Sequence, residues 1–112
     1  MKKFRYYMLT KDFEIVGTDS VQKWGVWFEE ADRHLALTKI GEIEVSTVFL
    51  GLDHSFHEDV PPVLWETMIF VGESKKTLFD HYQERYSSFD DARAGHERAV
   101  AMVRQKSDAR TQ

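Results

Sequence analysis

The chain has 112 residues, a length that fits one folded domain and leaves little material for a second core. Its 15 Lys+Arg residues against 19 Asp+Glu residues give a net charge of −4, which argues against general binding to nucleic-acid phosphates. The chain contains no cysteine, so disulfides, thiolate metal sites and cysteine nucleophiles are excluded, and a reducing cytoplasm is the expected location.

The first third of the chain predicts one strand and one helix. Residues 3–9 are aromatic-rich, which favours a strand because flat side chains pack well on a pleated surface. Apolar side chains at spacings of three and four then predict a helix over residues 20–32, capped by Asp19 or Ser20, with one stripe formed by Val21, Trp24, Trp27, Phe28 and Ala31. Gly25 costs roughly 1 kcal/mol inside a helix, so this helix must depend on burial of its aromatic side.

The middle of the chain predicts three strands. Residues 34–38 and 42–50 read as strands joined by a tight connection, and residues 63–71 show the clearest alternation of all. Pro61 and Pro62 cannot donate to a strand ladder, so they mark where pairing has not yet begun. On the strand that follows them, Glu66 is the only ionisable side chain on its face.

The last third predicts an edge strand and a second helix. Residues 81–86 alternate weakly, although a helix over residues 76–85 is the competing interpretation. Apolar residues then recur at helical spacing and predict a helix over residues 89–105, with Ser88 before Asp90 and Asp91 at its start. Residues 105–112 lose the apolar stripe, so we expect a frayed tail.

Together these elements predict a single α+β domain over residues 1–112. We expect an antiparallel sheet of four or five strands, with both amphipathic helices packed on one face of it. A small sheet leaves an exposed edge and spare aromatic side chains, so a homodimer is a reasonable expectation.

The connection between the strands 42–50 and 63–71 concentrates the potential chemistry of the chain. Its residues Asp53, His54, His57 and Glu58 form the pattern D-H-x-x-H-E. A polar loop held between rigid strands is where small domains commonly place a functional site. Imidazole and carboxylate are ligands for zinc, iron or manganese, so Asp53, His54 and His57 are candidate metal ligands. The other interpretations are a solvated turn, in which Asp53 and His54 bond to the backbone, and a metal-free binding site.

Three further residues are candidates for ligand binding, in addition to Asp53 and His54. Glu66 lies where alternation predicts burial, so it is either a functional carboxylate or one neutralised by Arg85. Thr67 beside it has a hydroxyl that can bond a ligand. His96 lies on the apolar stripe of the second helix, and Gly95 beside it allows another element to approach closely; a core histidine is the simpler interpretation, unless it faces Glu66 or Asp53.

Several strings in the chain resemble a family of small uncharacterised proteins of bacteriophages and prophages. The strings are WGVWFEEADRHLALT (residues 24–38), VSTVFLGLDHSF (45–56), PPVLWETMIF (61–70) and ERYSSFDDARAGH (84–96). The family pattern runs W-x-x-W-F-E-x-A-D-R, S-T-V-F-L-G-x-D-H, P-P-L-L-F-E-T-M-V-F and R-Y-x-T-W-x-E-A-x-x-G-H. The resemblance implies expression in an infected or lysogenic bacterium but no particular activity. Relatives usually have a Gly-rich loop where this chain has residues 57–60, so a phosphate-binding role for that loop is not carried over.

The functional expectation is a phage or prophage accessory protein that binds a small molecule or a host protein without catalysis, for example to counter a bacterial defence. No cofactor is expected, and no stretch approaches the ~20 apolar residues that span a membrane. Phosphate-loop, dinucleotide-fold and hydrolase-elbow motifs are absent from the sequence. The alternatives are a metal-dependent hydrolase built from Asp53, His54, His57 and Glu66, and a purely structural role.

Overall fold

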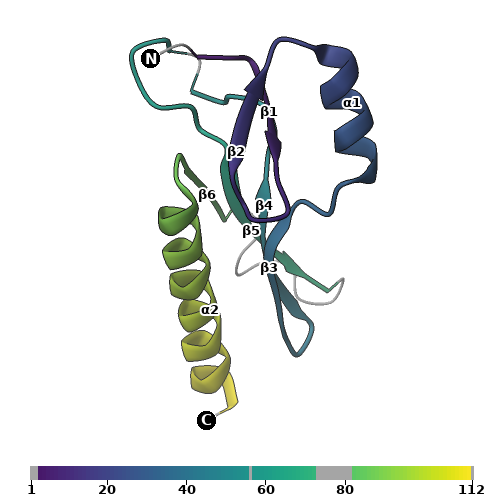
Figure 1. Ribbon diagram of the computed structural model, residues 1–112. Helices are drawn as coiled ribbons and strands as arrows, with labels where there is room; N and C mark the ends of the chain where they lie inside the picture. Colours follow the sequence, from purple (N-terminus) through teal and green to yellow (C-terminus); the bar gives the residue numbers. More distant parts are fainter. Residues whose placement is uncertain (1–2, 56, 73–81, 112) are drawn as a thin grey trace.

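The computed structural model describes residues 3–55, 57–72 and 82–111 and has an α+β fold (Figure 1). Strands β1 and β2 form a two-stranded antiparallel sheet, and β3 to β6 form a four-stranded antiparallel sheet in the order β3-β4-β5-β6. The elements in chain order are β1 Tyr6–Leu9, β2 Ile15–Thr18, α1 Val21–Glu30, β3 His34–Ile40, β4 Ile43–Phe49, β5 Trp65–Val71, β6 Gln83–Tyr86 and α2 Phe89–Thr111. The predicted fold class and the four-stranded sheet are confirmed.

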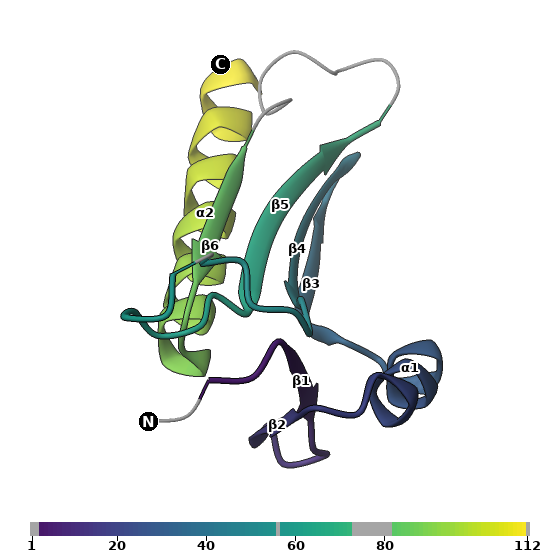
Figure 2. The same cartoon turned by 90° about the horizontal axis from the view of Figure 1, so that it is seen from above.

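The two helices reach the four-stranded sheet in different ways. Helix α2 lies along one face of that sheet, whereas α1 lies with the β1–β2 hairpin at one end of it (Figure 2). Trp27 of α1 nevertheless packs on Phe49 of β4, with ring centroids 5.9 Å apart, and Phe89 of α2 packs on Trp65 of β5 at 5.8 Å. Both helices therefore contribute to one aromatic cluster, although α1 otherwise contacts the β1–β2 hairpin, which the sequence did not predict.

Two apolar clusters fill the space between the sheet and α2. One contains the inward-facing residues Phe49, Trp65 and Tyr86, which are register partners on three neighbouring strands. The other, nearer the C-terminal end of α2, contains Ile43, Val45, Ile69, Ala99 and Val103. Alternation along each strand places these side chains on the same face, where burial of their apolar surface stabilises the fold.

Several predicted boundaries change in the structure. Ser20 caps α1, because its hydroxyl accepts a hydrogen bond from the backbone N–H of Lys23 at 3.2 Å. Strand β6 confirms the edge-strand interpretation for Gln83–Tyr86, while residues 76–81 of the competing helix lie outside the described residues. The expected frayed tail over 105–112 is wrong for the part described, since α2 continues to Thr111. No Gly or Pro interrupts that segment, so the backbone stays helical after the apolar stripe has ended.

Replacing Gly95 by Ala tests the close contact between α2 and the sheet. A Cβ at Gly95 would overlap the hydroxyl of Tyr86, so the helix or the tyrosine must move. We expect Gly95→Ala to lower the free energy of unfolding by roughly 1–3 kcal/mol, measured by urea denaturation. The matched control is Gly25→Ala in α1, where no heavy atom lies within 4 Å of the added Cβ; it should stabilise by roughly 0.5–1 kcal/mol. Equal effects of the two substitutions would contradict the expected contact.

Candidate functional site

The loop between β4 and β5 forms a pocket together with the N-terminal segment. The cavity has a volume of about 460 Å³. Its walls combine both signs of charge with two apolar side chains: Lys3, Phe4, Arg5, Leu52, Asp53, His54, His57 and Glu58. We call this cavity the loop pocket. Three residues of the sequence-predicted site, Asp53, His54 and His57, therefore lie around one cavity.

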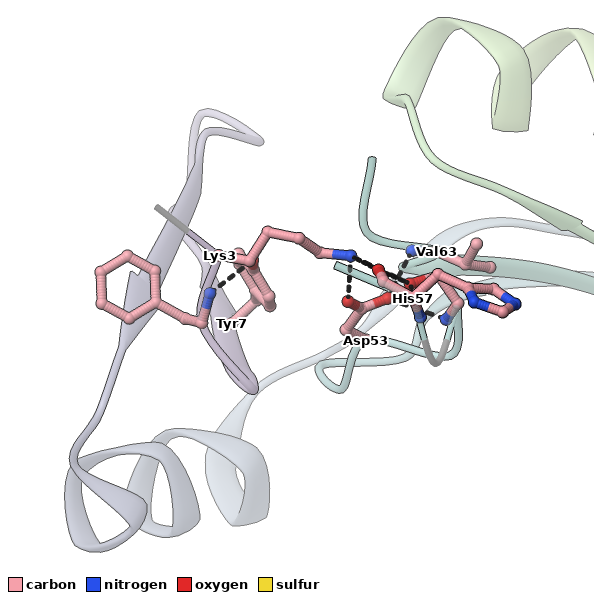
Figure 3. Close-up of polar contacts among 7 residues, drawn as sticks. Lys3, Tyr7, Asp53, His57 and Val63 are labelled. Carbon is pink, nitrogen blue, oxygen red and sulfur yellow. Dashed lines mark hydrogen bonds and ion pairs between the residues drawn. The ribbon is translucent and has the colours of Figure 1, made fainter. Parts of the chain in front are cut away.

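Lys3 ties the N-terminal segment to the loop (Figure 3). Its Nζ lies 2.9 Å from Oδ2 of Asp53, donates to the hydroxyl of Ser55 at 3.0 Å, and donates to the carbonyl of His57. The side chains of Lys3 and Asp53 are only 15% and 13% exposed. A sheltered ion pair is screened by salt less than a surface pair is. Removing one of the two partners would leave the other charge buried and unpaired. We refer to these contacts as the Lys3 clamp.

Asp53 is held in its ionised form. Burial by itself would raise the pKa of Asp53, but hydrogen bonds from Lys3 and from backbone N–H groups outweigh it and lower the pKa to about 2. The backbone donors to Oδ1 are the N–H of Ser55 at 2.8 Å and that of Val63 at 3.0 Å. Asp53 thus joins the two ends of the loop as a turn-stabilising carboxylate and also forms part of the wall of the pocket.

The start of the loop is fixed by its contacts with β1 and α1. The carbonyl of Gly51 accepts hydrogen bonds from the N–H of Tyr7 at 2.9 Å and from the indole of Trp24 at 3.0 Å. Gly51 has a φ of 80°, a conformation that disfavours residues with a Cβ. The backbone N–H of His54 donates to the carbonyl of Val63 at 3.0 Å. The loop pocket is therefore positioned by segments that are far apart in the sequence.

Glu66 lies away from the loop pocket. Its carboxylate accepts hydrogen bonds from Arg85 at 2.8 Å and from Gln83 at 2.7 Å, both on β6, and its side chain is 9% exposed. The interpretation that Arg85 neutralises Glu66 is consistent with this ion pair. Among the described residues, no three His, Asp or Glu side chains are grouped so as to hold a metal ion.

His96 and Thr67 belong to a second polar cluster, buried between the sheet and α2. The ring of His96 is hydrogen-bonded through Nδ1 to Thr47 at 2.8 Å and through Nε2 to Thr38 at 2.9 Å. Thr47 is bonded in turn to Thr67 at 2.5 Å, and Thr67 accepts from the hydroxyl of Tyr86 at 3.1 Å. The cluster takes one residue from each strand of the four-stranded sheet, so we call it the hydroxyl–imidazole chain.

Burial controls the protonation of this chain. It lowers the pKa of His96, although the nearby charge of Glu97 acts in the opposite direction. His96 is therefore neutral at pH 7, with one ring nitrogen donating and the other accepting. Burial also raises the pKa of Tyr86. Beyond Tyr86, the carboxylate of Glu84 accepts hydrogen bonds from Tyr82 and Arg98, each at 2.9 Å.

Sequence reasoning identified some of these groups and missed others. Lys3 reads as an ordinary surface charge, because nothing in the sequence places it beside residue 53. Thr38, Thr47 and Tyr86 were also missed, although alternation puts Thr47 on the inward face of its strand. The useful signal would have been two inward threonines, Thr47 and Thr67, on adjacent strands with a histidine on the covering helix.

The comparisons with known proteins give no match. No family model matches the chain, and neither a curated protein nor a solved structure matches it. None of the described helices is long and apolar enough to cross a membrane. Function is therefore inferred from the loop pocket and the hydroxyl–imidazole chain.

The Lys3 clamp predicts a specific acid dependence of stability. Because the pKa of Asp53 falls from 3.8 to about 2 on folding, its contribution is present above pH 4 and is lost as the pH falls toward 2. We expect Asp53→Asn to lower the free energy of unfolding at pH 5 by about 2 kcal/mol, with the difference from wild type shrinking at lower pH. Asp59→Asn, an exposed change in the same loop, is the control in urea denaturation at several pH values. A pH-independent difference would contradict the role of the clamp.

The lowered pKa of His96 predicts a second pH dependence of the free energy of unfolding, in this case from a basic side chain. The unfolded chain takes up a proton at His96 near pH 6.5, whereas the folded chain, with a lowered pKa, does so only at lower pH. The free energy of unfolding should therefore fall as the pH drops from 7.5 to 5.5. His96→Gln should flatten this dependence, while His57→Gln, at an exposed position, should leave it in place. Retention of the full slope in His96→Gln would show that another group titrates.

Proposed function

We propose that this protein is a non-enzymatic binding protein, and that the loop pocket holds its ligand, a small molecule or a short part of a host protein. The observation that carries the proposal is a cavity of about 460 Å³ whose polar wall is held in place by the Lys3 clamp. A preorganised wall binds more tightly than a flexible loop, because less ordering entropy is lost on association.

The chemistry of Asp53 supports binding more than catalysis. A carboxylate with a pKa of about 2 is a poor general base at neutral pH, since it holds a proton too weakly. Asp53 is also occupied by Lys3 and by two backbone N–H groups. It acts as a support for the pocket wall, and this role needs no chemical step.

The wall of the pocket indicates the kind of ligand. Phe4 and Leu52 provide apolar surface, while Arg5 provides a permanent positive charge on a flexible side chain. His54 adds a hydrogen-bonding ring and Glu58 a negative charge. This combination favours an amphipathic ligand with a flat or apolar body and an anionic group, as in a nucleotide or a metabolite carboxylate.

The resemblance to bacteriophage and prophage proteins gives the proposal its biological setting. A small phage protein that sequesters a signalling molecule or a host protein would act in the bacterial cytoplasm without a cofactor or catalysis. Countering a bacterial defence by sequestration is the form of this role that we propose. The support for it is the resemblance in sequence pattern together with the polar wall of the loop pocket.

A thermal-shift screen with common mononucleotides and cyclic nucleotides tests the proposal. A ligand at one hundred times its Kd stabilises the folded state by about 2.7 kcal/mol, so a true ligand should raise Tm in a concentration-dependent way. Arg5→Gln should reduce the shift, and Lys11→Gln, an exposed change outside the pocket, should not. Equal shifts in both variants would contradict binding at the loop pocket.

The alternative function is a metal-dependent hydrolase. The observation in its favour is that Asp53, His54 and His57 line one cavity. Glu66, the fourth residue of that hypothesis, is bonded to Arg85 instead and would have to change partners. Metal analysis of the purified protein separates the two functions: a stoichiometric transition metal, with hydrolytic activity lost on chelation, would support the hydrolase and contradict the proposal above.

The homodimer expected from the sequence also stays a proposal. Its support is the exposure of Leu37 and Phe70, which are 46% and 50% exposed on the face of the sheet that α2 leaves open. Sedimentation of the purified protein over a range of concentrations measures the oligomeric state directly.

A further inference from the structure

A second cavity lies between β3 and α2 and shares no lining residue with the loop pocket. It has a volume of about 540 Å³ and is lined by Thr38, His96, Glu97, Val100, Ala101 and Arg104. Thr38 and His96 form its inner wall, where the hydroxyl–imidazole chain ends. We call this cavity the β3–α2 groove.

Strand β3 borders the groove and is an edge of the four-stranded sheet. Among the described residues its strand partner is β4 alone. The two-residue connection between Ile40 and Ile43 makes those residues a hydrogen-bonded pair, and pairing alternates from there. The backbone N–H and C=O groups of Leu37 and Lys39 therefore point outward, away from β4.

The sequence of β3 does little to prevent a further strand from pairing with it. Protected edges are usually short or interrupted by prolines and several charges. Strand β3 has seven residues, HLALTKI, with Lys39 as its one permanent charge and no proline. Its register irregularity lies between His34 and Ala36, before the outward-facing backbone groups of Leu37 and Lys39. It offers an open ladder directly beside a cavity, which is the arrangement used to bind an extended peptide by strand addition.

The charges along α2 define what the peptide must carry. Glu97 and Arg104 stand at the two ends of the groove, and Val100 and Ala101 lie between them. With a rise of about 1.5 Å per residue, each charge lies roughly 5 Å along the helix from the apolar centre. Alternate side chains of a strand lie about 7 Å apart on one face, a spacing that the flexible side chains of Glu97 and Arg104 can match.

We propose that the β3–α2 groove binds an extended peptide segment of another protein, which adds to the sheet as a fifth strand beside β3. Its groove-facing side chains are basic, apolar and acidic at alternate positions. The basic side chain pairs with Glu97, the apolar one packs on Val100 and Ala101, and the acidic one pairs with Arg104. Within the described part of the chain, neither Glu97 nor Arg104 has an ion pair that would compete.

The groove suits a peptide better than a second copy of this chain. Helix α2 lies over the middle of the sheet, since His96 bonds to Thr47 on β4 and Arg98 bonds to Glu84 on β6. If two β3 edges paired, the two α2 helices would stand well apart and leave the groove between them unfilled. A single extended chain fills that space with its own side chains and satisfies the outward backbone groups of β3 at the same time.

A designed peptide tests this inference on the intact protein. The probe carries lysine, valine and glutamate at alternate positions with threonine between them. On titration into labelled protein, the amides of Leu37 and Lys39 should shift in the NMR spectrum and become protected from hydrogen exchange. Arg104→Glu should weaken binding roughly tenfold, and Arg93→Glu, the same change on α2 outside the groove, should have little effect.

A charge exchange makes the test specific. The double variant Glu97→Lys with Arg104→Glu should bind poorly to the first peptide but well to a peptide with lysine and glutamate exchanged. Absence of binding by either peptide would overturn the inference, as would amide shifts confined to the loop pocket. Protection of Leu37 and Lys39 in the free protein that rises with protein concentration would assign the edge to a second copy. This site and the loop pocket share no residues, so either proposal can fail without the other.

Discussion

The position of α2 on the sheet depends on the buried hydroxyl–imidazole chain. Apolar contacts alone leave a helix free to slide, because many offsets bury similar areas. Hydrogen bonds are directional, and a buried polar atom that loses its partner costs about 1–3 kcal/mol. The bonds from His96 to Thr38 and Thr47 therefore fix both the rotation and the height of α2. The same position of α2 requires glycine at residue 95, since only a residue without a Cβ lets the helix approach Tyr86 this closely.

The aromatic cluster at one end of the core contains one buried polar group without a hydrogen-bond partner among the described residues. Trp65 is completely buried between Phe49 and Phe89, with ring centroids 5.0 and 5.8 Å away in edge-to-face geometry. Its indole N–H has no hydrogen-bond partner among the described residues. An unsatisfied donor is normally avoided in a core. Here the free energy gained by burying the large tryptophan ring exceeds the cost of the unsatisfied N–H. Shape complementarity determines the packing at the aromatic end of the core, whereas hydrogen bonding determines the packing at its centre.

The predictability of the fold follows from the range of the interactions. Local alternation predicted burial of Glu66, with neutralisation by Arg85 as one of two interpretations, and the structure shows the two side chains paired across neighbouring strands. The structure also confirms the strands predicted at β4 and β5 and the close approach at Gly95. Sequence reasoning missed β2, since a four-residue strand with Ile15 and Val16 exposed has little apolar pattern.

The candidate sites were less predictable than the fold, because their decisive contacts join distant parts of the sequence. Nothing near Lys3 shows that it will meet a carboxylate 50 residues later. The loop itself could be located, since its residue types are concentrated between two strong strands. Its ordering could not be foreseen, because it depends on β1 and α1, which approach only after the chain has folded.

The two proposed binding surfaces differ in how the sheet supports them. The loop pocket is made of irregular backbone, so it relies on an ion pair and on side-chain bonds to a carbonyl, and its shape is sensitive to the charge of Asp53. The β3–α2 groove is made of regular elements, so its geometry is fixed by the core. Tyr86 lies between them: its carbonyl accepts from Leu64 at the end of the loop, and its hydroxyl donates into the chain that ends at the groove. Hydrogen bonds therefore connect Leu64 at the end of the loop, through Tyr86 and the hydroxyl–imidazole chain, to the wall of the groove.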